Sequence, residues 1–124
     1  MLNETLKLKG RVNLVLKDKD GNVKETRDID NLVVTTGLGY IASRMKDATA
    51  TAMSHMALGS GTTSAAAGDT DVESILGSRE ALDSTTVSGN AVTYIASFEA
   101  GDGTGAVTEA GLFNAASSGT VLCR

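Results

Sequence analysis

Aromatic residues are scarce in this chain, which has 124 residues but only two Phe, two Tyr and no Trp. The core must therefore be filled mainly by aliphatic side chains and Met. Aromatic rings are also the usual anchors of interface hot spots and the usual stacking surfaces for bases and sugars. Their scarcity argues against a carbohydrate-binding module and against a module for single-stranded nucleic acid.

Cysteine, excess positive charge and long apolar runs are lacking as well. The single cysteine, Cys123, excludes an internal disulfide framework and fits folding in a reducing cytoplasm. The formal charge of −4 and the pI near 4.8 disfavour nucleic acid as a partner, because binding to phosphates needs a basic surface. No run of about 18 apolar residues occurs, so no membrane-spanning segment is predicted. The alternating N-terminus is not a signal peptide.

Hydrophobic periodicity predicts several short strands and a single helix. Residues 5–17 alternate between apolar and polar side chains, and a turn at 18–22 leads into a second strand over 23–29. Further strands are expected at 55–58, 79–87, 91–98, 107–113 and 120–124, with one helical turn at 72–76 and loops at 59–71 and 101–105. A helix is predicted over 37–47 by apolar residues at helical spacing, namely Leu38, Ile41, Ala42 and Met45.

Strands joined by hairpin-like turns favour antiparallel pairing. The chain is therefore predicted to form one β-rich domain over 1–124, an all-β fold of the antiparallel β-sandwich or jelly-roll-like kind with one short helix near residues 37–47. The strands do not alternate with helices, which disfavours a doubly wound α/β fold.

One candidate metal site fails because its spacing is wrong. Asp18, Asp20 and Asn22 begin like a calcium-binding EF-hand loop. The sixth position is Val23 and the twelfth is Ile29, where that loop requires glycine and glutamate. A turn is the better interpretation of this segment.

Other candidate sites are incomplete. The glycine-rich segments 59–61 and 101–105 lack the Lys-Ser/Thr pair or the following helix of a phosphate-binding loop. His55 and Cys123 provide too few zinc ligands, and a Cys–His nucleophile pair would use a cysteine next to the last residue. The neighbouring carboxylates of Glu99, Asp102 and Glu109 have no aromatic sugar platform nearby. We therefore expect no enzyme activity, no cofactor and no metal site.

Glu109 stands out because it lies in the otherwise apolar segment 108–113. A carboxylate in such a strand is costly to bury unless it is paired. Arg79 and Arg124 both flank apolar strands, and we hypothesise that Glu109 pairs with Arg79. The alternative is that Glu109 points into solvent.

Interface residues are expected in loops and on strand edges. The charged face of the first strand would meet an acidic neighbour, although a solvated strand face is the alternative reading. The predicted interface residues are Lys7, Lys9 and Arg11 on the first strand and Ser60, Thr62 and Asp102 in the loops.

Several turn and strand motifs follow one another in an order that covers nearly the whole chain. They are 20–24 (DGNVK), 31–38 (NLVVTTGL) running into 41–42, 56–63 (MALGSGTT) with 69–70, 108–113 (TEAGLF) and 119–124 (GTVLCR). In this order they resemble a family of small structural proteins of tailed bacteriophages, known as decoration, fibre or tail-associated proteins. Such proteins usually continue past a Leu-Cys-Arg segment, so the natural chain is expected either to extend beyond Arg124 or to leave a sheet edge open to a neighbour.

The resemblance implies a virion structural protein that is made in the host bacterial cytoplasm. The leading interpretation is a non-enzymatic capsid decoration or cement subunit that binds the assembled particle. Its partners would be itself, as a homo-oligomer such as a trimer, and the major capsid protein or other virion proteins. The alternatives are a component of the tail, baseplate or fibre base and, from a different class, a host-glycan binding module.

Overall fold

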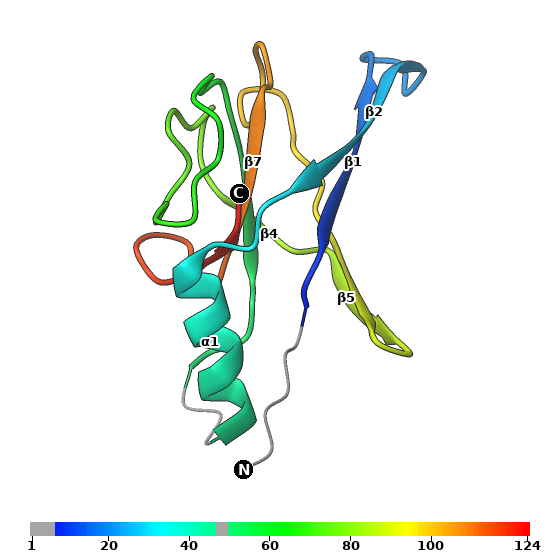
Figure 1. Cartoon of the computed structure of the whole chain (residues 1–124). Coiled ribbons are helices and arrows are strands. Elements are labelled where there is room, and N and C mark those ends of the chain that lie inside the picture. The colour runs from blue at the N-terminus through cyan, green and yellow to red at the C-terminus, as the bar shows by residue number, and fades with distance from the viewer. Residues whose placement is uncertain (1–6, 47–49) are drawn as a thin grey trace.

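The computed structural model describes residues 7–46 and 50–124, which form one helix and eight strands (Figure 1). In chain order the elements are β1 (Gly10–Lys17), β2 (Val23–Asn31), α1 (Thr35–Lys46), β3 (His55–Gly59), β4 (Glu80–Ala81), β5 (Ser84–Ser88), β6 (Ala91–Ile95), β7 (Glu109–Phe113) and β8 (Val121–Cys123). Every strand pair is antiparallel. The predicted β-dominated fold with antiparallel sheets and one short helix is confirmed.

The strands form three hydrogen-bonded sets. A central sheet has the order β4-β3-β7-β8, and β1–β2 and β5–β6 are separate hairpins that extend from it (Figure 1). Just after β2, the backbone of Leu32 exchanges hydrogen bonds of 2.9 and 3.0 Å with that of Arg124, so the first hairpin is joined to the β8 edge of the central sheet. These sets do not confirm the predicted sandwich or jelly roll.

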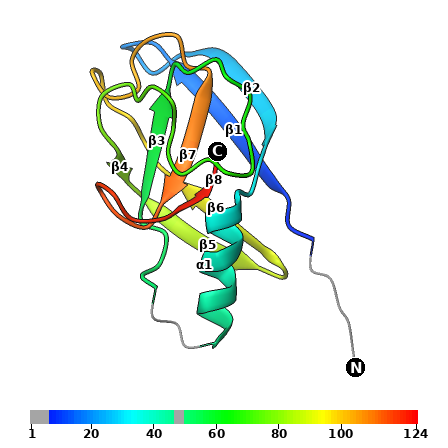
Figure 2. The ribbon, with the colours of Figure 1, turned by 60° about the vertical axis from the view of Figure 1, so that its left-hand side comes forward.

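Two apolar clusters occupy opposite faces of the central sheet. One cluster contains Phe113 and Ala57, and the other contains Leu112 and Met56. They lie on opposite faces because successive residues of a strand point to opposite sides of the sheet. Phe113 is fully buried, so the chain places one of its few aromatic rings at the centre of its core. The loop 60–75 covers the Phe113 face, while α1 and Tyr94 of β6 lie on the Leu112 face (Figure 2).

Two of the predicted elements are wrong. Residues 72–76 form bends rather than a helical turn, because backbone groups of this segment bond to Glu109, Ser60 and Leu58 instead of to each other. The strand predicted over 79–87 is divided into β4 and β5, because the chain changes sheets between Leu82 and Asp83. The Leu82 N–H bonds to Ser54 and the Asp83 N–H to Ile95.

Gly37 is buried where α1 contacts β8. A Cβ atom at this position would lie 2.0 Å from the carbonyl oxygen of Leu122, which belongs to the backbone and cannot rotate away. At Gly39, in the same helix, a Cβ atom would have no neighbour within 4 Å. The two glycines therefore have opposite roles, the first allowing close packing and the second only weakening the helix.

We expect Gly37→Ala to lower the free energy of unfolding by about 1–3 kcal/mol, since the added methyl group overpacks the α1–β8 contact. Gly39→Ala is its matched control and should raise the free energy of unfolding by about 0.5–1 kcal/mol through helix propensity. Urea denaturation measures both values. Effects of the same sign would show that α1 does not approach β8 this closely.

Candidate functional site, a buried arginine and carboxylate network

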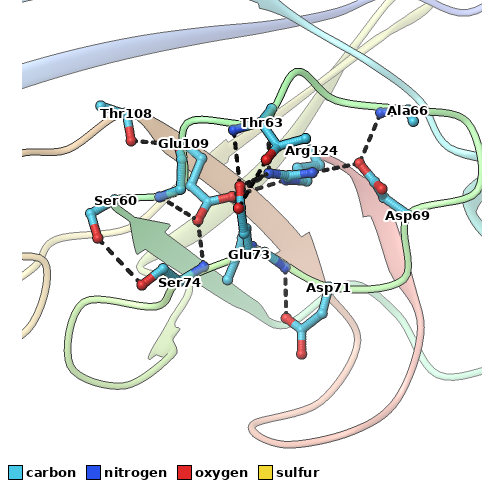
Figure 3. A network of polar contacts seen from close by, with 12 residues as sticks. Ser60, Thr63, Ala66, Asp69, Asp71, Glu73, Ser74, Thr108, Glu109 and Arg124 are labelled. Carbon is cyan, nitrogen blue, oxygen red and sulfur yellow. Dashed lines mark hydrogen bonds and ion pairs between the residues drawn. The ribbon is translucent and has the colours of Figure 1, made fainter.

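Glu109, the first residue of β7, has a side chain that is only 5% exposed and points into the loop 60–75 (Figure 3). Its carboxylate accepts hydrogen bonds from the backbone N–H groups of Gly61 at 2.9 Å, Glu73 at 2.9 Å and Ser74 at 2.8 Å. Because these donors come from both ends of the loop, one carboxylate fixes where the loop leaves the sheet and where it returns.

Arg124 follows β8 and is the cation of the site, with a side chain that is 6% exposed. Its Nε donates to Glu109 at 2.9 Å and its Nη1 to Asp69 at 2.6 Å. Its Nη2 donates to the carbonyl oxygen of Thr63 at 3.2 Å and lies 3.4 Å from a carboxylate oxygen of Glu73. We refer to Arg124, Glu109, Asp69 and Glu73 as the Arg124 network.

The two loop carboxylates of the network also shape the loop itself. Asp69 accepts a hydrogen bond of 2.8 Å from the N–H of Ala66. Glu73 accepts bonds of 3.0 and 2.9 Å from the N–H and the hydroxyl of Thr63. Each carboxylate therefore serves the guanidinium group and the loop backbone or side chains at once, and Figure 3 shows these contacts converging on Arg124.

The contacts of the network keep Glu109, Asp69 and Arg124 charged. Burial raises the pKa of Glu109, but the N–H groups of Glu73, Ser74 and Gly61 and the Arg124 guanidinium outweigh it and hold this pKa below its usual range. The N–H of Ala66 and then Arg124 lower the pKa of Asp69. Burial lowers the pKa of Arg124, but its bonds to Asp69 and Glu109 outweigh this effect and raise it. The stable state of the site is therefore an arginine cation among carboxylate anions.

The predicted pair between Glu109 and Arg79 is wrong, since Glu109 pairs with Arg124. The guanidinium of Arg79 lies 3.5 Å from the centre of the Phe113 ring, at the other end of β7. Glu109 and Phe113 are four residues apart, which is about 13 Å along a strand. Arg79 instead donates to the carbonyl oxygens of Ala115 at 3.0 Å and Ser118 at 2.7 Å, and thereby supports the loop between β7 and β8.

The structure brings only some of the predicted interface residues to this site. Ser60 bonds to Ser74 within the loop, and Thr62 lies exposed beside the network. Lys7 and Lys9 are exposed before β1, and Arg11 forms a surface ion pair of 2.6 Å with Asp28. Asp102 accepts two bonds of 2.8 Å from Ser78, so its carboxylate already has an intramolecular role. Interface contacts of all six residues, Lys7, Lys9, Arg11, Ser60, Thr62 and Asp102, stay predictions.

A cleft of about 350 Å³ lies between the β1–β2 hairpin and the Arg124 network. Ile29 and Asp30 of β2 line one side, and Thr62, Thr63 and Arg124 line the other. The charged groups that reach this cleft from the network are bonded to one another and to the loop. The arrangement is suited to holding the loop 60–75 in one conformation.

The remaining candidates from the sequence have ordinary structural roles. The turn reading of 18–22 is confirmed, because Asp18 accepts bonds from the N–H groups of Asp20 and Asn22. His55 Nδ1 lies 2.8 Å from the hydroxyl of Ser54, and burial raises the pKa of the Cys123 thiol. Over residues 7–46 and 50–124, no group of three His, Cys, Asp or Glu side chains is placed to hold a metal ion, and no helix is long and apolar enough to cross a membrane.

Comparison of the chain with protein-family models, with curated proteins and with solved structures finds no match.

The Arg124 network makes stability sensitive to acid. Because the pKa of Glu109 is lower in the folded than in the unfolded state, unfolding takes up a proton, and this contribution to stability is present above pH about 4.3, the usual pKa of Glu. It is lost as the pH falls through the folded-state pKa. We expect the free energy of unfolding to decrease from pH 5 to pH 3 more steeply in the wild type than in Glu109→Gln, which cannot titrate there. Urea denaturation at each pH measures the slopes, and identical slopes would contradict this role of Glu109.

Proposed function

We propose that this chain is a non-enzymatic structural protein of a bacteriophage virion, and that it binds the assembled capsid as a decoration subunit. The observation that carries the proposal is the large surface, much of it apolar, that a single copy exposes. The order of sequence motifs, which resembles that of small phage structural proteins, supplies the kind of particle. The exposed surface supplies the reason to expect assembly.

The accessible surface of the chain is 8201 Å². A compact monomer of 12.7 kDa exposes about 6,200 Å². The nine residues outside the described ranges account for about 1,400 Å² of the difference at most, the value for a fully extended chain. At least about 500 Å² remains, which is more than half of the area of about 800 Å² that one partner contributes to a standard protein interface.

The exposed apolar side chains are concentrated outside the central sheet. The β1–β2 hairpin exposes Val15, Val23 and Ile29, α1 exposes Leu38 and Met45, and the β5–β6 hairpin exposes Val87, Val92 and Ile95. Met45, Val87 and Val92 line one hollow between α1 and the β5–β6 hairpin, and apolar surface gathered in this way marks a contact site. This site suits a subunit that is completed by its neighbours.

The fixed loop supports the same role. Glu109 and Arg124 hold the loop 60–75 from inside, while most of its side chains face outward. A preorganised loop loses little conformational freedom on binding, so weak contacts repeated over a lattice are sufficient for stable attachment.

An add-back experiment tests the proposal. Particles made by a phage from which the coding sequence has been deleted are incubated with the purified chain and sedimented. Particles should form without a decoration subunit. The purified chain should then sediment with the particles that lack it and should raise their resistance to heat. Loss of tails in the deletion would instead assign the chain to the tail or baseplate. Complete particles that never contained the chain and do not bind it would overturn the virion role.

A further inference from the structure

β2 has one free edge. Its other edge pairs with β1 along the whole strand, from Val23 opposite Lys17 to Asn31 opposite Gly10. On the free side, backbone bonding to the central sheet begins only after the strand, at Leu32, although the Arg27 side chain bonds to the carbonyl oxygen of Val107. Within residues 7–46 and 50–124 no strand pairs with this edge between Val23 and Asp30. Figure 1 shows the outer part of the hairpin standing apart from β7.

The backbone bonds of Leu32 show which residues of β2 direct their hydrogen-bonding groups to the free edge. The N–H and C=O of Leu32 both bond to Arg124, on the side away from β1. Because these groups alternate sides along a regular strand, Asp28 and Thr26 direct theirs to the same side. Leu16 faces Glu25 and Lys17 faces Val23, so Lys24 is the extra residue of a β-bulge at the outer end of this segment.

The segment Val23–Ile29 reads as a palindrome of complementary side chains centred on Thr26. If a second copy pairs antiparallel about a two-fold axis at Thr26, Lys24 faces Asp28, Glu25 faces Arg27, and Val23 faces Ile29, each contact occurring twice. The neighbouring two-fold centres that the backbone allows are excluded by charge, since a centre on Glu25 opposes two glutamates and a centre on Arg27 opposes two arginines. Thr26 is the centre in this part of β2 that places no like charges opposite each other.

From these observations we infer that two copies of this chain pair through the free edge of β2, with Thr26 at the two-fold axis. This deepens the proposed assembly role by naming the partner and the contact. Two backbone hydrogen bonds would form at Thr26, and the Lys24–Asp28 positions would add theirs if the bulge at Lys24 straightens on pairing. Charged residues on an edge strand usually prevent such pairing, but here their order makes the edge complementary to itself.

The apolar groups that would meet are exposed in the single chain, whereas Asp28 already bonds to Arg11 and Arg27 to the carbonyl oxygen of Val107. The exposed fractions of Val23 and Ile29 are 59% and 52%, so their contact would cover apolar surface that water now reaches. Glu25 and Arg27 already form an ion pair of 2.9 Å within one strand. In the dimer the two pairs would join into a group of four charges across the axis.

Charge reversal with mixing tests this inference. Sedimentation equilibrium of the full chain should show a dimer. Glu25→Arg and Arg27→Glu should each weaken self-association roughly tenfold or more, because two cross-strand contacts become like-charged. An equimolar mixture of the two variants should restore the dimer, since arginines of one copy then face glutamates of the other. Glu99→Arg, an equal change of charge on an exposed loop residue, is the control and should leave the dimer intact.

Three results would overturn the inference. They are a wild-type chain that stays monomeric, single variants that associate like the wild type, and a mixture of folded variants that stays monomeric. A structure with another segment of the chain or another protein on this edge would also refute it. This outcome can be told apart from a failure of the virion role. A monomeric chain that still binds particles lacking it would contradict only the dimer. A dimeric chain that does not bind such particles would contradict only the decoration role.

Discussion

Replacing Arg124 by Ala is expected to lower the free energy of unfolding by about 3–5 kcal/mol, the cost of breaking a buried ion pair from one side. The change leaves Glu109 buried without its cation and removes the group that joins Asp69 and Glu73 to the sheet. Because the loop 60–75 then loses its second anchor, its amides should also exchange hydrogen faster. Urea denaturation and hydrogen exchange measure these two effects.

Arg11→Ala is the matched control for this prediction. Arg11 and Asp28 approach to 2.6 Å, the same distance as Arg124 and Asp69, but their side chains are 71% and 45% exposed. Exposed pairs contribute little to stability because solvent screens them, so burial and not distance separates the two variants. If Arg124→Ala and Arg11→Ala destabilise the chain equally, the Arg124 network does not hold the loop as described.

Phe113→Ala is expected to cost about 3–5 kcal/mol, since it empties the centre of one of the two apolar clusters. Phe113 is fully buried, and its ring also lies beneath the guanidinium of Arg79. Removing the ring therefore weakens the support of the β7–β8 loop as well as the core. Thermal and urea denaturation measure the loss.

Phe98→Ala provides the comparison, because Phe98 is half-buried and lies outside the two core clusters. It should cost about 1–2 kcal/mol, in proportion to the smaller buried area. A larger loss for Phe98→Ala than for Phe113→Ala would place the centre of the core elsewhere.

The sequence predicted strands and the helix well where the periodic pattern is long and regular. The alternation in 5–17 and the turn at 18–22 correspond to β1 and its hairpin, although β1 begins at Gly10 and residues 5 and 6 lie outside the described part. The helix predicted over 37–47 is found at Thr35–Lys46, with residue 47 outside that part as well. Much of its apolar stripe stays exposed, since Leu38 and Met45 are 47% and 77% exposed, while Ile41 is half-buried. Periodicity reports which side chains share a face and not what covers that face.

The site was only half predictable for a related reason. The apolar surroundings of Glu109 indicated a buried pair, because an unpaired carboxylate there would be costly. Its partner depends on how strands from distant parts of the sequence align, and that alignment places Arg124 beside Glu109 and Arg79 beside Phe113. Asp69 and Glu73 were missed because they lie in a loop without periodicity. The one sequence signal for them is that they are carboxylates flanking Val72, a buried apolar residue in that loop.

The exposed apolar surface leads to the most direct test, which is a cryo-electron microscopy map of particles made by the phage that we propose encodes this chain. We expect copies attached in a regular arrangement over the outer capsid, with Met45 and Val87, now 77% and 71% exposed, covered by neighbouring protein in the particle. A complete virion with no copy of the chain would contradict the assembly role. Attached copies whose apolar hairpin and helix faces remain open to solvent would show that this apolar surface does not drive the attachment.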